Sequence, residues 1–302
     1  MKPHSTRRTF LAGLGAVAAA TNLPSLAAAN RMPGVRFGYA AITWGNEERQ
    51  AIDDIAAAGF HGIQFRANAV TDFKPAELKD LLSQHKLTFV ALSSGEVSLN
   101  EPAADQIAKH VANAQFVKNS GGLYLQILDK LTSYDRSVTP DDCKRLGRLL
   151  TELGKRTADI GIPLGYHNHL NTLSQRPANL DLILENSDPK YVGFELDTAH
   201  LVAGGGDPAK AIEKYHHRLL FLHLKDVRDV PPDTPKVRYP FEFVELGRGR
   251  VDFPSVFAAL EKIKFHGWAV VELDRVPDKS GTPKQSAVIS KDYLVQNIGI
   301  SV

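Results

Sequence analysis

Short runs of β-branched and aromatic residues alternate along this chain with longer stretches in which apolar residues recur at helical spacing. The short runs predict strands at residues 36–43, 62–66, 88–93, 123–127, 163–168, 191–197, 219–225 and 269–273. The longer stretches predict helices at residues 47–58, 75–85, 103–119, 140–160, 178–185, 208–215 and 254–263. Regular alternation of strands and helices is typical of a parallel sheet covered by helices.

Eight such units in about 240 residues favour a closed (β/α)8 TIM barrel that forms a single α/β domain. Asp207-Pro208 and Thr139-Pro140 each offer a helix cap followed by a proline in the first turn, which supports the expected helix starts. A doubly wound open sheet is the alternative. It normally has a glycine-rich turn after its first strand, and residues 42–46, ITWGN, lack one. Residues 230–239 predict a long loop on the active-site side, and the tail from Lys291 is expected to cover the barrel or to mediate contacts.

The first 29 residues read as an export signal. Arg7 and Arg8 precede an apolar run of small residues, and Ala27-Ala28-Ala29 suits a signal peptidase. This segment resembles a bacterial twin-arginine signal, so we expect a periplasmic protein whose barrel comprises residues 30–302.

Composition narrows the possible partners. The formal net charge is +2, from 36 basic and 34 acidic residues, which gives no electrostatic reason to expect nucleic acid. After signal removal no stretch is apolar enough for a membrane span. Cys143 is the only cysteine, so an internal disulfide is impossible. We expect a small-molecule ligand, and a homo-oligomer is possible.

Polar residues at the carboxyl ends of barrel strands are the candidates for chemistry, because barrel active sites form there. Four consecutive strands end near His167, Asp197, His223 and Glu272, and alternation allows all four to point inward. Any one of them has an equally good structural explanation, such as a helix cap, but the four together favour one bound divalent metal ion. Two imidazoles and two carboxylates suit Mn²⁺, Co²⁺ or Zn²⁺ better than Ca²⁺.

Five motifs carry a resemblance to a known family. They are GYHNH at 165–169, FELDTAHL at 194–201, LHLKDV at 222–227, GRGRVDF at 247–253 and VE at 271–272. Together they resemble the xylose isomerase-like barrels, often called sugar phosphate isomerases/epimerases. The resemblance implies a metal-dependent enzyme of carbohydrate chemistry, but it does not specify one reaction.

Residue by residue, the resemblance implies that Asp197, His223 and Glu272 are metal ligands and that His200 contacts the substrate. The chain departs from D-tagatose epimerase-like members on the fifth strand, because it lacks their glutamate ligand there. Its Tyr-His-Asn-His sequence is more similar to the inosose dehydratase and 3-keto-glycoside-processing branches. We therefore expect His167 as the fourth ligand.

The chemistry that the resemblance implies is abstraction of an α-proton through a metal-stabilised enolate. We expect Glu272 to act as both ligand and base, with His200, His169 and Lys225 as candidate second groups. Substrate contacts are expected from a further set of residues: Trp44, Arg66, Asn168 and Glu195. Packing at the barrel mouth is an equal alternative for Trp44, and an ion pair with Lys225 is one for Glu195.

Three functions remain open from sequence. The first is an isomerase or epimerase of an unphosphorylated sugar or keto-sugar. The second is a lyase or hydratase that eliminates a β-oxygen from a 3-keto-glycoside or a cyclitol, which the missing strand-5 glutamate favours slightly. The third is a non-catalytic sugar-binding barrel, which the three matched ligands argue against. DNA repair of the endonuclease IV type would need further histidines at strand ends occupied by Gln64, Arg66, Ser93 and Ser94.

Overall fold

The structure is a computed structural model that describes residues 32, 34–131, 137–231 and 239–302. The expected export signal, residues 1–29, lies outside the described residues, so the twin-arginine assignment stays a prediction.

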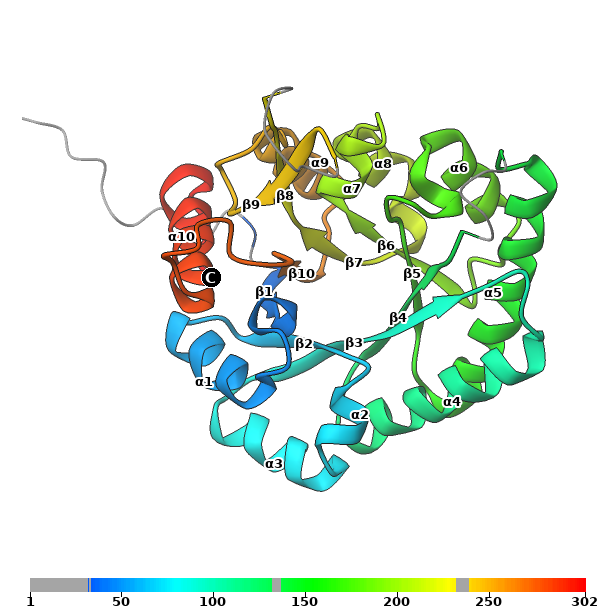
Figure 1. The fold of residues 1–302 in the computed structure, drawn as a ribbon, viewed down its shortest axis with the longest axis horizontal. Coiled ribbons are helices and arrows are strands. Elements are labelled where there is room, and N and C mark those ends of the chain that lie inside the picture. Colours follow the sequence, from blue (N-terminus) through cyan, green and yellow to red (C-terminus); the bar gives the residue numbers. More distant parts are fainter. Residues whose placement is uncertain (1–31, 33, 132–136, 232–238) are drawn as a thin grey trace, which may run out of the picture.

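Eight parallel strands close into a barrel in the order β1-β10-β7-β6-β5-β4-β3-β2, surrounded by helices (Figure 1). The strands are β1 (Val35–Ala40), β2 (Gly62–Arg66), β3 (Thr88–Val97), β4 (Tyr124–Asp129), β5 (Leu164–His167), β6 (Val192–Asp197), β7 (Leu219–Leu224) and β10 (Gly267–Val271). The pairing of β1 with β10 closes the ring, with Val35 opposite Gly267. The predicted (β/α)8 barrel is therefore confirmed.

Helices connect the strands on the outside. They are α1 (Glu48–Ala58), α2 (Ala69–Asp72), α3 (Pro75–Gln84), α4 (Ala103–Asn119), α5 (Pro140–Ile160), α6 (Pro177–Glu185), α7 (Thr198–Ala203), α8 (Pro208–Tyr215), α9 (Phe253–Lys262) and α10 (Pro283–Tyr293). Local signals start several of them. Thr139 forms a capping box with Asp142 at α5, and Asp207 caps α8 ahead of Pro208. Every residue of β10 is buried, as expected for a strand with side chains packed on both faces.

The structure contains an element that the sequence did not predict. An antiparallel hairpin, formed by β8 (Asp226–Asp229) and β9 (Phe241–Val244), flanks the loop predicted at residues 230–239. Each strand has only four residues, DVRD and FEFV, so its alternation is too short to stand out in the sequence. Residues 232–238 between them lie outside the described part.

The hairpin is anchored by one buried carboxylate. Asp226 accepts hydrogen bonds from its own neighbour Val227 N at 2.9 Å and from three amides of the GRGRVDF motif: Gly247 N at 3.0 Å, Gly249 N at 2.9 Å and Val251 N at 3.1 Å. A side-chain Cβ at Gly249 would lie 2.3 Å from the Asp226 carboxylate, so the motif needs glycine at that position. The spacing of this motif therefore has a structural purpose.

The first strand and the C-terminal region also differ from the elements that the sequence predicts. The first strand ends at Ala40, and Ala41–Trp44 form a 3-10 turn. The C-terminal region forms α10, which the sequence reading did not predict as a helix. It packs beside α1, and Lys291 Nζ donates to Ala58 O at 2.9 Å. Among the described residues, no helix is long and apolar enough to cross a membrane.

Candidate metal centre and active site

The carboxyl ends of β5, β6, β7 and β10 bring the four expected ligands together. Strand register places Asp197 beside His223 and His223 beside Val270, two residues before Glu272. His223 Nδ1 lies 3.2 Å from Glu272 Oε2 and 3.7 Å from Asp197 Oδ2. Ligand atoms of His167, Asp197 and His223 all lie within 4.8 Å of one another. The geometry therefore groups the four side chains as the alternation predicted.

These side chains have the unpaired atoms that a cation would satisfy. Asp197 Oδ2, His167 Nδ1 and His223 Nδ1 are buried and have no hydrogen-bond partner. Buried polar atoms normally have partners, because an unpaired one costs about 1–3 kcal/mol. The donor set, imidazole nitrogens with carboxylate oxygens, suits a divalent transition metal ion. The residues present therefore fit a metal.

Protonation is consistent with this fit. Burial holds the pKa of His167 and of His200 well below the usual range, so both imidazoles are neutral and able to donate a lone pair. Burial acts in the same direction on His223, but the neighbouring carboxylates of Glu195 and Glu272 outweigh it and raise its pKa. A cation bound at Nδ1 would take the place of that proton, because metal ligands bind in their deprotonated form.

Asp197 also positions His200. Its Oδ1 accepts from His200 N at 2.8 Å and caps α7, while Oδ2 remains free on the metal side. The Asp-x-x-His spacing thus lets one carboxylate start a helix and bring the imidazole three residues later over the site. Asn168 ties this corner to β5, because its side chain bonds Asp197 N at 2.9 Å and Asp197 O at 3.1 Å.

Lys225 is buried and contacts several polar side chains on the other side of the site. Its Nζ donates to Glu272 Oε1 at 2.9 Å and to Asp274 Oδ1 at 2.5 Å, and it lies 3.3 Å from His200 Nε2. Phe243 of the hairpin covers it, with the ring centroid 4.3 Å from Nζ. The ammonium is therefore fully engaged, and it holds one oxygen of Glu272 away from the metal side.

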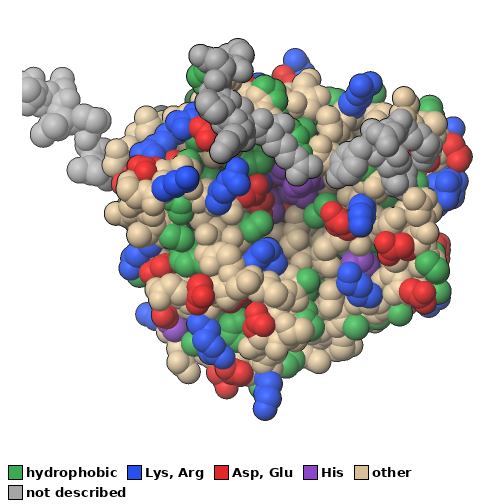
Figure 2. Space-filling view, in the orientation of Figure 1, with side chains coloured by type: hydrophobic (Ala, Val, Ile, Leu, Met, Phe, Trp, Pro, Cys, Tyr) green, Lys and Arg blue, Asp and Glu red, His purple; other side chains and the backbone are tan. Residues whose placement is uncertain are grey.

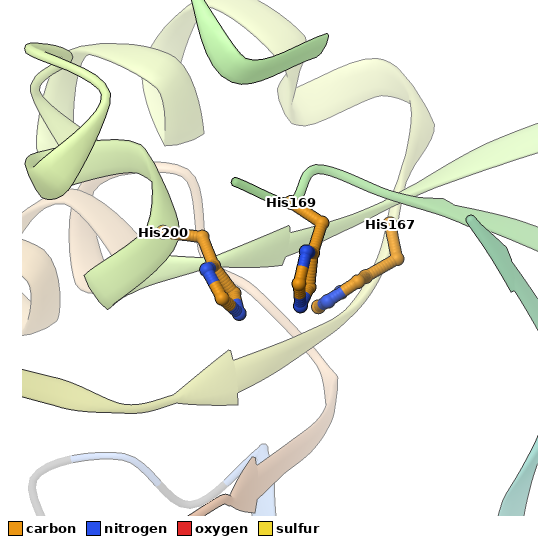
Figure 3. A group of neighbouring side chains, drawn as sticks. All are labelled: His167, His169 and His200. Atoms are coloured by element: carbon orange, nitrogen blue, oxygen red, sulfur yellow. The ribbon is translucent and has the colours of Figure 1, made fainter. Parts of the chain in front are cut away.

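Three imidazoles, those of His167, His169 and His200, form a second group whose geometry could bind a metal. Figure 3 shows His167 and His169 on the chain leaving β5 and His200 on α7, with the three rings turned toward one another. The His169 and His200 ring centroids are only 3.8 Å apart. However, the Lys225 ammonium lies 3.3 Å from His200 Nε2 and would repel a cation there. The group that contains Asp197 is therefore the better fit for a cation.

A cavity of about 160 Å³ opens onto these residues. Its lining includes His167, His169 and Glu272, together with four polar residues from other strands: Gln64, Arg66, Gln126 and Asp274. Histidine side chains are visible within a hollow on this face of the molecule (Figure 2). A larger groove of about 730 Å³ lies between α8 and α9, but none of the strand-end residues lines it.

The expected substrate contacts divide into two groups. Arg66 lines the cavity. Trp44, Asn168 and Glu195 do not: Trp44 packs edge-on against Tyr39 and donates to Asp54 Oδ2 at 2.9 Å. Glu195 is fully buried, and its partner is His223, at 2.7 Å between Oε1 and Nε2, in place of the ion pair with Lys225 considered from sequence.

The sequence reading gave no role to Gln64, Gln126, Asp274 or Phe243. The only available signals were their strand-end positions and, for Asp274, its place two residues after Glu272 on the same face. Phe243 belongs to a row of three aromatic side chains, of which two lie on one face of β9 and the third, Tyr239, precedes the strand. Phe241 and Phe243 centroids are 5.8 Å apart, and Tyr239 stacks on Phe241 at 5.4 Å.

Comparison with known proteins places the chain among barrels of this kind. The xylose isomerase-like TIM barrel family matches residues 52–293. An inosose dehydratase of Lacticaseibacillus casei is 28% identical over 295 residues, which cover 88% of this chain and 98% of that protein. Another from Geobacillus thermodenitrificans is 27% identical with the same coverage of both chains.

Solved structures share the fold. The IolI protein with a bound zinc atom has a TM-score of 0.72 at 18% identity, covering 87% of this chain and 98% of that one. The probable 3-DHS dehydratase AsbF from Bacillus anthracis has a TM-score of 0.70 at 16% identity, covering 86% of this chain and 99% of that one.

Proposed function

Since the chain belongs to the xylose isomerase-like TIM barrel family, we propose that it is a metal-dependent lyase that eliminates a β-oxygen from a keto-cyclitol, such as an inosose, or from a 3-keto-glycoside. Sequence alone put an isomerase or epimerase first. The similarity to inosose dehydratases over 88% of the chain supports the second function, elimination.

The observation that carries the proposal is the convergence of three buried, unpaired ligand atoms beside a polar cavity. His167, Asp197 and His223 supply those atoms, and Glu272 supplies a fourth ligand through Oε2. A divalent ion held there would polarise the carbonyl of the substrate and make the adjacent C–H bond more acidic.

His169 is the side chain best placed to remove the α-proton. Its Nδ1 donates to Leu170 O at 2.6 Å, so the lone pair is on Nε2, and the ring lines the cavity. Glu272, the base expected from sequence, is less free to act, because Lys225 binds its Oε1 and the metal side takes Oε2. We therefore assign Glu272 to ligand binding and the base role to His169.

The elimination balances with this one group. His169 Nε2 takes the proton as the α C–H bond breaks and the C=C bond forms. The β C–O bond then breaks, and the oxygen leaves with the electron pair of that bond. The proton on His169 passes to the departing oxygen, so the products are an unsaturated ketone and water, or an alcohol when the leaving group is a glycosidic oxygen. Lys225 binds Glu272 and lies beside His200, and it thereby keeps these two side chains in position.

The test is incubation of the Zn²⁺- or Mn²⁺-loaded protein with an inosose and a panel of 3-keto-glycosides in D2O, followed by proton NMR and mass spectrometry. We expect loss of the α-proton signal and a product that has lost water or the aglycone. A product of unchanged connectivity with deuterium at the α-carbon would instead establish an isomerase. Absence of both exchange and turnover with every substrate would reject the proposal; chelator-treated protein and Asp197→Asn are the controls.

A further inference from the structure

A line of buried polar side chains runs beneath the metal site, from Glu195 on β6 through His223 on β7 to Gln64 on β2 and Gln126 on β4. Each of the four is at most 2% exposed. His223 Nε2 lies 2.8 Å from Gln64 Oε1 and 2.7 Å from Glu195 Oε1. Gln64 Nε2 lies 2.9 Å from Gln126 Oε1.

The positions of the oxygen atoms fix the direction of the hydrogen bonds. Two oxygens, Gln64 Oε1 and Glu195 Oε1, lie within 2.8 Å of His223 Nε2, so this nitrogen is the one that carries hydrogen. His223 Nε2 is therefore a donor, and the Gln64 group beside it is the carbonyl oxygen. The Gln64 amide then donates to Gln126, whose own carbonyl accepts.

Two consequences follow for the site. His223 Nδ1 is left as the lone-pair nitrogen, and it is this atom that faces Glu272 and Asp197. Gln126 is left with its NH₂ group unused by Gln64, and Gln126 lines the cavity. A group that only donates at that position selects for an oxygen acceptor on the substrate.

We infer that Glu195 is a positioning residue that, together with Gln64, makes His223 Nδ1 the metal-binding atom, and that the Gln126 amide is a hydrogen-bond donor to a carbonyl or hydroxyl oxygen of the substrate. This inference rests on the metal site of the proposed function. It assigns to Glu195 a role in place of the substrate contact expected from sequence.

The first test replaces the Glu195 carboxylate and measures metal binding. Glu195→Gln has the same shape but can donate or accept, so it releases the constraint on His223. We expect its affinity for Zn²⁺, measured by chelator competition, to fall roughly 10- to 100-fold, the usual effect of losing a partner of a metal-binding histidine. In the Zn²⁺-loaded protein the imidazole Nε2–H resonance of His223 should also move upfield.

Gln64→Met provides a second variant, because it removes the other acceptor at His223 Nε2 and should weaken Zn²⁺ binding in the same direction. The matched control is Gln106→Leu, which removes a buried glutamine that bonds Ser98 and lies outside the metal site. It should lower the melting temperature without changing Zn²⁺ affinity. Wild-type Zn²⁺ affinity in both folded variants, Glu195→Gln and Gln64→Met, would overturn the inference, whereas failure of the wild type to bind metal would reject the proposed function itself.

The second test examines Gln126. Gln126→Glu still accepts from Gln64 but has lost the donor that faces the cavity. We expect KM to rise at least 10-fold while Zn²⁺ affinity changes little, as for loss of a well-placed substrate hydrogen bond. An unchanged KM in a folded, metal-loaded Gln126→Glu would show that this amide does not bind the substrate.

Discussion

Glu272 and His169 both line the cavity, but their side chains differ in what they are free to do. Glu272 has Lys225 on one oxygen and the metal side on the other, whereas His169 has a free Nε2. We predict that His169→Gln retains metal and loses roughly 10²-fold or more in turnover, the typical size of a lost general base. Glu272→Gln should lose metal affinity and recover much of its turnover at excess metal.

Metal occupancy and α-proton exchange in D2O, measured on the same samples, separate the two roles. The contrary result is a metal-replete Glu272→Gln that no longer exchanges the α-proton while His169→Gln exchanges at the wild-type rate. In that case Glu272 would be both ligand and base, as the sequence suggested.

His110 gives a pH-dependent stability that is independent of the metal site. It is buried in α4, where Nδ1 lies 2.7 Å from Ser94 Oγ and Nε2 lies 3.3 Å from Glu96 O, and burial lowers its pKa to about 4. The unfolded chain therefore binds this proton from about pH 6.5 downward, while the folded chain binds it only near pH 4. Stability is present above the unfolded pKa and is lost as the pH falls through this window, by up to about 3 kcal/mol.

We predict that His110→Gln is less stable than the wild type at pH 7 but loses less of its stability between pH 6.5 and pH 4. Urea unfolding at several pH values measures the difference. His217→Gln is the control, because His217 is exposed. Parallel curves for the wild type and His110→Gln would show that His110 does not titrate in this way.

At the scale of elements, the β8–β9 hairpin depends on Asp226. We predict that Asp226→Asn lowers the free energy of unfolding by about 3 kcal/mol, because an amide can accept on one side only and its NH₂ group then faces backbone N–H groups. Asp252→Asn is the matched control in the same motif. Asp252 is an exposed cap of α9, so its replacement should cost about 1 kcal/mol. Equal losses for both variants, measured by urea unfolding, would contradict a special role for Asp226.

The hairpin also affects the site, because Phe243 lies over Lys225 and 5.0 Å from the His200 ring. A second contact, from Asn171 Nδ2 to Tyr239 OH at 2.7 Å, joins the hairpin to the segment after β5. The element that the sequence did not predict as structured thus covers the part of the site that holds Lys225 and His200.

At the scale of the whole molecule, the sequence predicted the features that follow a repeating pattern. It did not predict contacts between side chains that are distant in the chain. Regular alternation predicted the barrel, and period-2 spacing on consecutive strands grouped His167, Asp197, His223 and Glu272. The pairing of Glu195 with His223, and of Lys225 with Asp274, depends on contacts between side chains of neighbouring strands that are separated along the chain. No local pattern encodes such contacts, and the same holds for the pairing of β8 with β9.

Export also belongs to the whole molecule. We predict that replacing Arg7 and Arg8 by lysine leaves the precursor in the cytoplasm of a bacterium that has the twin-arginine pathway, because that pathway reads the arginine pair. Immunoblots of periplasmic and cytoplasmic fractions measure the outcome, with Arg31→Lys as the control. Normal periplasmic accumulation of the double variant would rule out this route.

Asp226 fixes both ends of the hairpin. The hairpin segment can therefore change in sequence and length independently of the barrel. Asp226 receives the amides on each side of the inserted segment, so the segment can lengthen, shorten or be replaced while the register of the eight strands stays as it is. The hairpin segment can thus be exchanged without a change in the barrel. Grafting the corresponding segment from a related barrel, with Asp226 and Gly249 left in place, offers a route to altered substrate preference without redesign of the metal centre.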